Sequence, residues 1–504
     1  MKTSRFGWAA LAAQALSASL AWAQMAPVTQ PGAAAPQPVA SQPPQPGATA
    51  SQPPQPGATA SQPPQPGATA SQPPQPGATA SQPTASTSES GRIYIAVGSP
   101  NVKKVLLAIE TTRGTQGLMG DFYATLTNDM DYTDLFEVLP PGRLPPAKAL
   151  GTIDVNVYRG LGVEFVLQSS VERKANGQVE AQVRLFDVSR GTQILGRAYP
   201  LVSASGQPAR ELAHYAGNDI IQTLTGEPGI FRTRLLMSCG NRTKEIYIMD
   251  FDGMNVRQLT QDRNFALSPS WAPDGKRLLF TSYKPAVKGG ALNPNLYLYD
   301  MSNQQRRLLS AARGLNTGGA FHPRDDKVAY TFSQNGRPEI YVLDLSSNTR
   351  RAITKTQFFS VEPAWSPDGT RLAYSSSATG RPHIYVASSE GTNAVRLTFA
   401  GVYNSSPQWA PRGDRIVFSG QENKANNFNV FSIDPNGSNL QRLTDGRHSS
   451  ENPVWSPDGR HIAFSSNQDG QYRIYVMSAR GTKIRVLSPR NLGPCKQPSW
   501  SPRL

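Results

Sequence analysis

Side chains that could act in catalysis or hold a metal are few in this sequence and lie far apart. The chain has five histidines and two cysteines among 504 residues. The histidines fall in different segments without the spacing of a metal site: His214, His322, His383, His448 and His461. No Gly-x-Ser-x-Gly motif supplies a nucleophilic serine. We therefore expect no catalytic residue, no metal site and no cofactor.

Two groups of aspartates need a separate explanation. The segment Asp250-Phe-Asp-Gly253 begins like a calcium-binding loop but lacks the remaining ligands and the distal glutamate of that motif. Asp274, Asp368 and Asp458 occupy one position of a recurring motif, Trp-(Ala/Ser)-Pro-Asp-Gly. In that motif proline fixes φ and glycine supplies a positive φ, so turn chemistry explains these aspartates without catalysis.

The motif marks a repeat in the second half of the chain. Its aromatic residue recurs every 44 to 50 residues, at Trp271, Phe321, Trp365, Trp409, Trp455 and Trp500. A proline stands two residues before the aromatic in five copies, and Gly319 takes its place in the sixth. Short apolar segments before and after each motif, such as 371–375, 384–387 and 395–398, predict strands. Four strands in about 45 residues predict one blade of a β-propeller.

The number of repeats predicts a closed ring of six blades over residues 229–504. The last repeat reaches Leu504 directly after its first strand, whereas residues 232–260 supply the later strands of a blade without a first one. We expect residues 498–500 to complete the blade that residues 232–260 begin. Both ends of the propeller segment would then close the last blade, whereas an open solenoid would leave two bare edges.

The sequence before residue 92 does not predict a folded domain. Residues 1–23 combine Lys2 and Arg5 with an apolar run and Ala-Trp-Ala, which predicts a cleaved signal peptide and export; an uncleaved anchor is the alternative. Residues 24–91 repeat Ser-Gln-Pro-Pro-Gln-Pro-Gly-Ala-Thr-Ala four times, which predicts a disordered tether with polyproline-II character. The tether is either a spacer in the cell envelope or an idle insertion.

Residues 92–228 predict a small α/β domain. Apolar patterns predict strands at residues 92–97, 104–109, 135–139, 164–172 and 179–188. Helices are expected at residues 117–128, 153–159 and 208–225. The predicted fold is therefore an α/β amino-terminal domain followed by an all-β six-bladed propeller.

The two cysteines lie on either side of the expected ring closure. Cys495 precedes the aromatic residue of its repeat by five residues, as Ser360 does in an intact blade. Alignment of the following strands places Cys239 on Ser376, and these two serines lie symmetrically about a turn. In an exported protein this placement predicts a disulfide between Cys239 and Cys495, with two buried free thiols as the alternative.

The net charge of +15 is concentrated in the propeller. Residues 229–504 contain 35 Lys and Arg against 20 Asp and Glu, whereas residues 92–228 have a net charge of −1. Export together with this distribution argues against a nucleic-acid partner. A basic propeller suits an acidic protein surface or anionic wall polymers.

The order of these segments resembles the TolB family of the Tol-Pal system over residues 92–504. The resemblance rests on the six repeats, on the ending Trp500-Ser-Pro-Arg-Leu504 and on the junction Thr225-Gly-Glu-Pro-Gly-Ile-Phe-Arg-Thr-Arg234. It implies a monomeric, non-enzymatic adaptor in the periplasm. Its partners would be a Pal-like outer-membrane lipoprotein at the propeller mouth and a TolA-like inner-membrane protein at the amino-terminal region. The implied role is outer-membrane integrity and constriction during cell division.

The resemblance also implies where the lipoprotein binds. In such proteins the contact lies on loops that lead into the first strand of each blade. The corresponding residues here are Leu315, Asn316, Thr317, Phe359, Val361, Glu362, Tyr403, Arg447, His448 and Glu451. We expect these loops to expose aromatic, Arg and His side chains, the usual anchors of an interface. Leu315–Thr317 and Val361-Glu362 match the contact region best.

One feature departs from the family. There the mature amino terminus itself begins the segment that docks or is released toward the TolA-like protein, but here about 68 residues precede residues 92–97. Either the tether carries the contact outward or the switch is absent. Two other functions stay open: a propeller hydrolase, and a propeller that binds peptidoglycan or anionic glycans directly.

Overall fold

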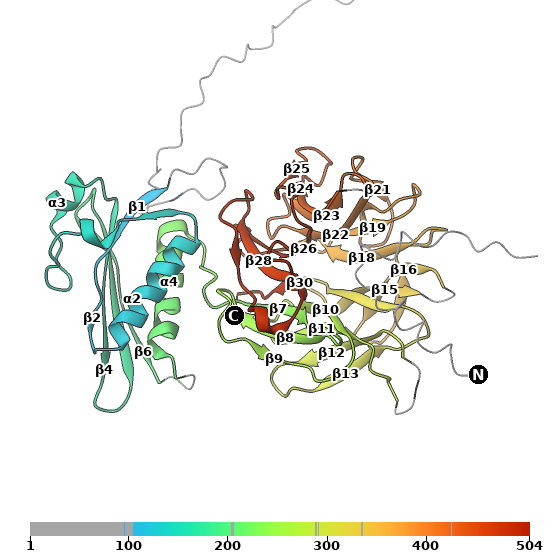
Figure 1. Ribbon diagram of the computed structural model, residues 1–504, viewed down its shortest axis with the longest axis horizontal. Helices are drawn as coiled ribbons and strands as arrows, with labels where there is room; N and C mark the ends of the chain where they lie inside the picture. Colours follow the sequence, from blue (N-terminus) through green and yellow to red (C-terminus); the bar gives the residue numbers. More distant parts are fainter. Residues whose placement is uncertain are drawn as a thin grey trace, which may run out of the picture. The chain divides into compact units, whose positions relative to one another are not determined.

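The computed structural model describes Ile95 and residues 104–202, 206–287, 290, 292–333, 336–424 and 426–503. The signal peptide and the tether expected at residues 1–23 and 24–91 lie outside these residues, as does the strand expected at 92–97 except for Ile95. The described residues form an α/β domain and a β-propeller (Figure 1). None of the helices described is both long enough and apolar enough to cross a membrane.

A mixed sheet forms the centre of the α/β domain. Its strands are β1 (Val105–Ile109), β2 (Arg113–Gly114), β3 (Phe136–Val138), β4 (Phe165–Arg173), β5 (Val179–Asp187) and β6 (Thr192–Leu201). The order is β3-β1-β4-β5-β6, with β2 beside β4. β1 is parallel to β3 and β4, whereas β5 is antiparallel to β4 and β6. The helices are α2 (Leu118–Tyr132), α3 (Val155–Gly160) and α4 (Pro208–Thr225), with 3-10 turns at Pro141–Arg143 and, in the propeller, Arg490–Leu492.

Each face of this sheet contributes to a different core because side chains alternate along a strand. Leu107 packs in the core that contains Phe122 of α2 and Ile220 of α4. Its neighbour Ala108 packs in a second core with Tyr158 of α3. Figure 1 shows α2 and α4 side by side. The sheet is therefore covered by two long helices on one face and a short helix on the other.

The helix and strand predictions for the described part of this domain hold, apart from the end of α2 and two strands that were not predicted, the two-residue β2 and β6. α4 has the predicted bounds, and Gly226 ends it in the left-handed conformation with φ of 76°. α2 extends to Tyr132, beyond the predicted end at residue 128. β6 was not predicted, because it is an edge strand whose side chains are mostly exposed and lack the apolar alternation of an inner strand.

The propeller consists of six four-stranded antiparallel sheets. The first complete blade has β10 (Ala266–Trp271), β11 (Arg277–Ser282), β12 (Asn295–Asp300) and β13 (Arg306–Ser310). The next two have β14 (Asn316–Phe321), β15 (Lys327–Ser333), β16 (Pro338–Asp344), β17 (Arg350–Ala352), β18 (Ser360–Trp365), β19 (Arg371–Ser376), β20 (His383–Ser388) and β21 (Val395–Arg396). Two more have β22 (Tyr403–Trp409), β23 (Ile416–Gln421), β24 (Asn429–Ile433), β25 (Gln441–Arg442), β26 (Ser450–Trp455), β27 (His461–Ser466), β28 (Arg473–Ser478) and β29 (Arg485–Val486).

The sixth blade closes the ring as predicted. It combines β30 (Cys495–Trp500) with β7 (Arg234–Cys239), β8 (Glu245–Asp250) and β9 (Arg257–Gln258), in the order β30-β7-β8-β9. Cys495 lies directly opposite Cys239, and their sulfur atoms are bonded at 2.11 Å. In an intact blade Ser360 lies opposite Ser376 at the same register. The cysteines therefore occupy a position that serines fill elsewhere in the ring.

The outer strand of most blades is shorter than its sequence suggested. Residues 395–398 were expected as a strand, but β21 ends at Arg396. Two residues later the hydroxyl of Thr398 accepts the backbone N–H of Ile384 at 3.0 Å, where a backbone carbonyl would otherwise pair. The same contact to the third strand recurs at Thr260, Thr354, Thr444 and Ser488. A threonine or serine two residues after the short outer strand thus caps the end of these five blades.

Candidate partner-binding site at the propeller channel

The first strand of every blade carries a bulge at the same place. The antiparallel register shifts between Val361 and Ala364 of β18, and equivalent shifts occur in the other five first strands. Inside each bulge one residue has a positive φ between 50° and 63°: Ser268, Gly318, Glu362, Ser406, Asn452 and Gln497. We call these six residues the bulge ring. The residue after each is the proline, or Gly319, that precedes the motif's aromatic by two positions.

The bulge ring is strained in five of its six members. A left-handed conformation costs a residue other than glycine about 1–3 kcal/mol, and such residues persist only where the surrounding structure holds them. A bulge also redirects a side chain that regular pleating would place elsewhere. Five strained residues at one register position therefore indicate that the fold holds the bulge ring for a purpose beyond strand pairing.

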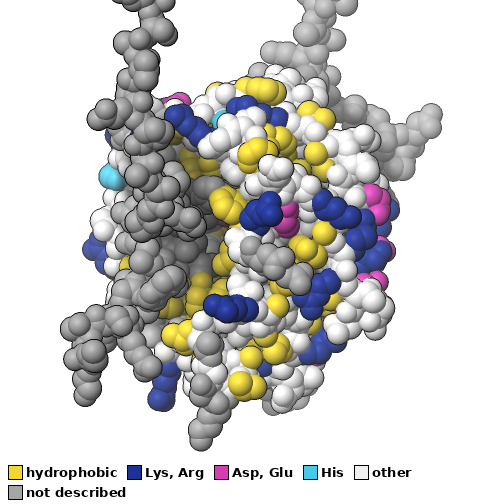
Figure 2. All heavy atoms as spheres, turned by 90° about the vertical axis from the view of Figure 1, so that its right-hand side faces the viewer, with side chains coloured by type: hydrophobic (Ala, Val, Ile, Leu, Met, Phe, Trp, Pro, Cys, Tyr) yellow, Lys and Arg dark blue, Asp and Glu magenta, His cyan; other side chains and the backbone are white. Residues whose placement is uncertain are grey.

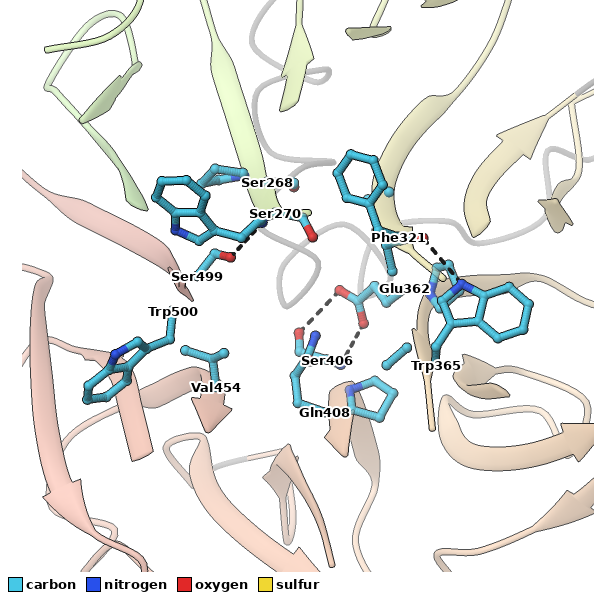
Figure 3. Close-up of a pocket in the computed structure, with 18 of the residues that line it drawn as sticks. Ser268, Ser270, Phe321, Glu362, Trp365, Ser406, Gln408, Val454, Ser499 and Trp500 are labelled. Atoms are coloured by element: carbon cyan, nitrogen blue, oxygen red, sulfur yellow. Dashed lines mark hydrogen bonds between the residues drawn. The ribbon is translucent and has the colours of Figure 1, made fainter. Parts of the chain in front are cut away.

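The bulge ring lines a central channel with a volume of about 340 Å³. Figure 3 shows its side chains arranged around the opening, with Ser268, Glu362 and Ser406 approaching from different blades. Most of the polar lining is uncharged, and Glu362 is the one charged side chain among the described residues that line the channel. The channel therefore combines hydrogen-bonding groups with a single carboxylate.

Glu362 is half-buried and is held by the neighbouring blade. Its Oε2 accepts the backbone N–H of Ser406 at 2.7 Å, and its Oε1 accepts the Ser406 hydroxyl at 3.3 Å (Figure 3). Its own N–H donates to Oγ1 of Thr331 in the preceding blade at 3.1 Å. Burial raises the pKa of Glu362, the bonds from Ser406 oppose that shift, and the nearby charge of Glu451 adds to it. The carboxylate is thus placed rigidly in a site that disfavours its charge.

Further hydrogen bonds continue around the bulge ring. Asn452 donates from Nδ2 to the Ser406 hydroxyl at 3.2 Å. The backbone N–H of Ser268 donates to Oε1 of Gln497 at 2.8 Å, which crosses from the closing blade to the next. These side chains link one blade to another, so their positions depend on the closed ring.

The structure places the ten expected contact residues in different environments. Glu362 alone among them lines the channel. Arg447 and His448 are exposed in the loop before β26, as expected, with Arg447 near Asp445. Leu315, Thr317, Phe359 and Val361 are half-buried at or just before the first strands of their blades.

Three of the ten are buried, and the burial of Tyr403 corrects the expectation that these loops expose their aromatic side chains. Asn316 is fully buried and donates to the carbonyl oxygens of Pro294, Ala312 and Gly314, so it shapes its own loop. The ring of Tyr403 packs edge-on against Phe428 at 5.5 Å.

Glu451 is the third buried residue. It accepts a hydrogen bond from the Tyr472 hydroxyl at 2.5 Å and pairs with Lys496 at 3.3 Å. Its carboxylate is therefore engaged inside the protein by Tyr472 and Lys496.

Sequence reasoning missed five members of the bulge ring: Ser268, Gly318, Ser406, Asn452 and Gln497. The signal was present, because four of them directly precede the repeated proline and Gly318 directly precedes Gly319, which replaces it. That proline aligns the repeats, but a residue before proline is ordinarily extended rather than left-handed. The bulge becomes apparent only from the pairing register.

The α/β domain contacts the propeller at the end of the blade strands opposite the loops that lead into the first strands. Arg480 and Lys483, in the turn between β28 and β29, pair with Asp134 at 3.0 and 3.1 Å. His461 donates from Nε2 to the carbonyl oxygen of Tyr132 at 2.8 Å. Burial alone would raise the pKa of Asp134, but hydrogen bonds from the surrounding cations lower it to about 2. These contacts use turns remote from the loops that lead into the first strands.

His383 and the aspartates of the apparent calcium loop have structural partners. His383 is buried between Thr398 and Asn404, and burial lowers its pKa to about 4. Asp250 and Asp252, the start of the apparent calcium loop, both bind the guanidinium of Arg210 at 2.8 Å.

The repeated motif aspartates act as the turn interpretation predicted. The carboxylates of Asp274, Asp368 and Asp458 each accept a backbone N–H two residues later. Among the described residues no three His, Cys, Asp or Glu side chains lie close enough to hold a metal ion.

The basic excess of the propeller is visible on its rim. Figure 2 faces the side where β13, β15 and β16 lie in Figure 1, and Lys and Arg side chains outnumber Asp and Glu there. The outer strands on this side contribute Arg306 and Arg307 of β13 and Arg350 and Arg351 of β17. This charge lies outside the channel, whose described lining contains no cation.

Comparison with known proteins identifies both domains. The family described as the TolB beta propeller domain matches residues 221–504, and the TolB amino-terminal domain matches residues 93–194. A crystal structure of TolB from Acinetobacter baumannii superposes with a TM-score of 0.70 and 26% identity, and covers 79% of this chain and 97% of that one.

Sequence relatives point to the same family. A protein of Desulfosudis oleivorans named "Tol-Pal system protein TolB" is 34% identical over 259 residues, which is 48% of this chain and 56% of that protein. A "Protein TolB homolog" of Chlorobium chlorochromatii is 34% identical over 281 residues, or 47% of this chain and 63% of that protein. The chain thus spans a little over half the length of these relatives. Because the propeller family covers more than half of the sequence, the chain belongs to the TolB family.

Proposed function

We propose that this chain is a non-enzymatic periplasmic adaptor of the Tol-Pal system that binds a Pal-like lipoprotein at the propeller mouth. The observation that carries the proposal is Glu362, a carboxylate fixed by Ser406 in a strained bulge at the channel. A partner that inserts a hydrogen-bond donor or a cation into the mouth would replace the water around this carboxylate. The names of the sequence relatives support membership of the system.

Access to the mouth supports the same proposal. The propeller turns that contact the α/β domain lie at the other end of the strands from Glu362, so a partner could engage the mouth while that contact persists. Exposed Arg447 and His448 lie in the loop before β26 and would form the polar rim of such an interface. The buried residues Asn316, Tyr403 and Glu451 would act by holding the loops in place.

For the second partner, we propose the amino-terminal region as the contact with a TolA-like protein. Ile95 is buried, and its N–H donates to the carbonyl oxygen of Leu224 near the end of α4 at 3.0 Å. A TolA-like partner that takes over this carbonyl oxygen would compete with Ile95 for α4. Integrity of the outer membrane and its constriction at division are the cellular role proposed for both contacts.

The experiment that tests the lipoprotein contact is crosslinked capture of the full chain from the periplasm. We expect recovery of an outer-membrane lipoprotein that has a peptidoglycan-binding domain, and its loss in Glu362→Gln. The matched control is Glu390→Gln, which removes a carboxylate from the same blade in the turn between β20 and β21, at the opposite end of the strands. Recovery of the lipoprotein by Glu362→Gln at the wild-type level would refute the site.

Direct binding of peptidoglycan or anionic glycans is a second candidate, favoured by the basic rim. A surface of one sign attracts anionic polymers without a shaped pocket, and the attraction weakens as salt rises. Purified sacculi stripped of lipoprotein would test it by co-sedimentation with the chain. Binding that persists on such sacculi and falls with salt supports glycan binding, whereas binding that requires the lipoprotein supports the adaptor.

A further inference from the structure

A second cavity, of about 370 Å³, lies where α4, the junction after Gly226 and the strands β7 to β9 meet. Basic side chains predominate in its lining: Arg210, His214, Arg232, Arg234 and Arg257 line it together with the acidic Glu211 and Asp250. The junction is the segment that carries the family resemblance in the sequence, and the proposed adaptor function does not use it. No residue of the bulge ring lines this cavity.

His214 is the buried polar group of this cavity. It is only 5% exposed, and its Nδ1 lies 2.8 Å from Oδ2 of Asp129, a buried carboxylate of α2. Because a carboxylate accepts, Nδ1 carries the proton and Nε2 is left on the other side of the ring. Among the described residues Nε2 has no hydrogen-bond partner. A buried nitrogen without a partner destabilises the folded chain, so a ligand that satisfies it binds more tightly for that reason.

The arginines differ in how far they are already engaged. Arg210 is committed to Asp250 and Asp252, which fixes the wall of the cavity. Arg232 stacks over the ring of Tyr215 at 4.1 Å, which orients its guanidinium without neutralising its charge. Neither Arg232 nor Arg257 has a carboxylate partner among the residues described. Two guanidinium groups and one imidazole are therefore left to bind a ligand.

We propose that this cavity binds an oxyanion, as a carboxylate or a phosphate group, held by His214 Nε2 and the guanidinium groups of Arg232 and Arg257. Guanidinium matches the geometry of both anions. A proton held between Nε2 and one oxygen of the anion would complete this contact, while Asp129 accepts from Nδ1 on the other side of the ring. Asp129 contacts the ring, and the other acidic groups that line the cavity or lie near Asp129 are Glu211, Asp250 and Asp252, with Arg210 among them.

The site has a structural consequence. His214 belongs to α4 of the α/β domain and Arg257 to β9 of the propeller, so one anion would bind both. A ligand that binds only the folded chain raises its unfolding temperature by mass action. Occupancy should therefore stabilise the junction between the domains without touching the channel.

The test uses the full chain, selectively labelled with 15N-histidine, and two probes: inorganic phosphate and succinate, each at 0.1 M ionic strength. We expect a dissociation constant of about 1 mM or tighter for at least one probe, and movement of the His214 Nε2 signal toward the protonated position. Arg257→Gln should weaken binding at least fivefold. Arg307→Gln is the matched control. Arg307 lies opposite Leu298 in the outer strand of its blade, the register position at which Arg257 lies opposite Ile248 in the closing blade.

The two probes and the two variants separate the possible outcomes. Binding of phosphate alone or of succinate alone identifies the class of oxyanion, and binding of both identifies a general oxyanion site. Absence of binding by both probes up to 10 mM overturns the proposal. Equal binding by Arg257→Gln and Arg307→Gln also overturns it, since both variants change exposed side chains and should unfold at the wild-type temperature.

Discussion

Removal of the Cys239–Cys495 disulfide should lower the stability of the propeller by an amount that the ring topology sets. The perturbation is the double change Cys239→Ser and Cys495→Ser. Serine already occupies this register position in another blade, where Ser360 and Ser376 face each other with their hydroxyl oxygens 3.4 Å apart. The variant therefore keeps a polar pair of similar size and loses the crosslink alone.

The magnitude follows from the length of chain that the disulfide closes. The cysteines are 256 residues apart. Loop-closure entropy for that separation is about 5.5 kcal/mol at 25 °C. For a domain of this size each kcal/mol shifts the unfolding temperature by about 2 °C, so the loss should be roughly 10 °C.

A relocated crosslink tests the topological part of that figure. Adding Ser360→Cys and Ser376→Cys to the serine variant places a disulfide at the same register in an intact blade, where it closes only 16 residues. The same relation then predicts about 3 kcal/mol, or a little over half of the loss recovered. Calorimetric unfolding of the oxidised wild type, the serine variant and the relocated variant supplies the comparison.

Two results would refute this reasoning. An unfolding temperature of the serine variant within 2 °C of wild type would show that ring closure does not depend on the crosslink. Full recovery by the relocated disulfide would show that the stabilisation is local, since a short loop would then serve as well as a long one. Wild-type protein with its disulfide reduced should unfold at the temperature of the serine variant, which checks both comparisons.

Three further changes follow from the described contacts. Burial raises the pKa of Glu362. Its negative charge therefore destabilises the folded chain by an amount that grows as pH rises above the unfolded pKa near 4.5. Glu362→Gln should unfold at a higher temperature than wild type at pH 7 and at the same temperature below pH 4. Hydrogen bonds from surrounding cations outweigh burial and lower the pKa of Asp134 to about 2, so its contribution is present above pH 4 and lost toward pH 2. Asp134→Asn should therefore cost about 1 kcal/mol in urea unfolding at pH 6, after allowance for solvent screening, and nothing at pH 2. Thr398→Val should cost about 1 kcal/mol by leaving the N–H of Ile384 without its acceptor, and exchange of that amide hydrogen should accelerate.

The propeller could be predicted well from its sequence because one motif encodes local turn chemistry six times. Proline and glycine restrict φ wherever the motif occurs, so the strand boundaries around Asp368 follow without knowledge of the neighbours. The ring closure followed from counting, since an incomplete blade at each end of the segment leaves one arrangement without bare edges. Both inferences depend on local rules or on the number of repeats.

The site was predictable only in part because its properties arise from contacts between blades. Tyr403 was expected at the surface, but Phe428 from another loop of its blade covers it. The partner of Glu362 is Ser406, one blade away, and the sequence carries no mark of that hydrogen bond. The pairing of His214 with Asp129 spans 85 residues and likewise depends on how α2 and α4 pack. Such contacts follow from the fold rather than from a motif.

A direct binding titration tests the proposed binding of a Pal-like lipoprotein at the propeller mouth through Glu362. The measurement is the dissociation constant between the purified full chain and the purified soluble domain of the lipoprotein, by calorimetry. We expect saturable one-to-one binding that Glu362→Gln weakens at least tenfold, about 1.4 kcal/mol, while Glu390→Gln in the same blade leaves it unchanged. Equal affinity of the two variants, or no binding by the wild type, would contradict it.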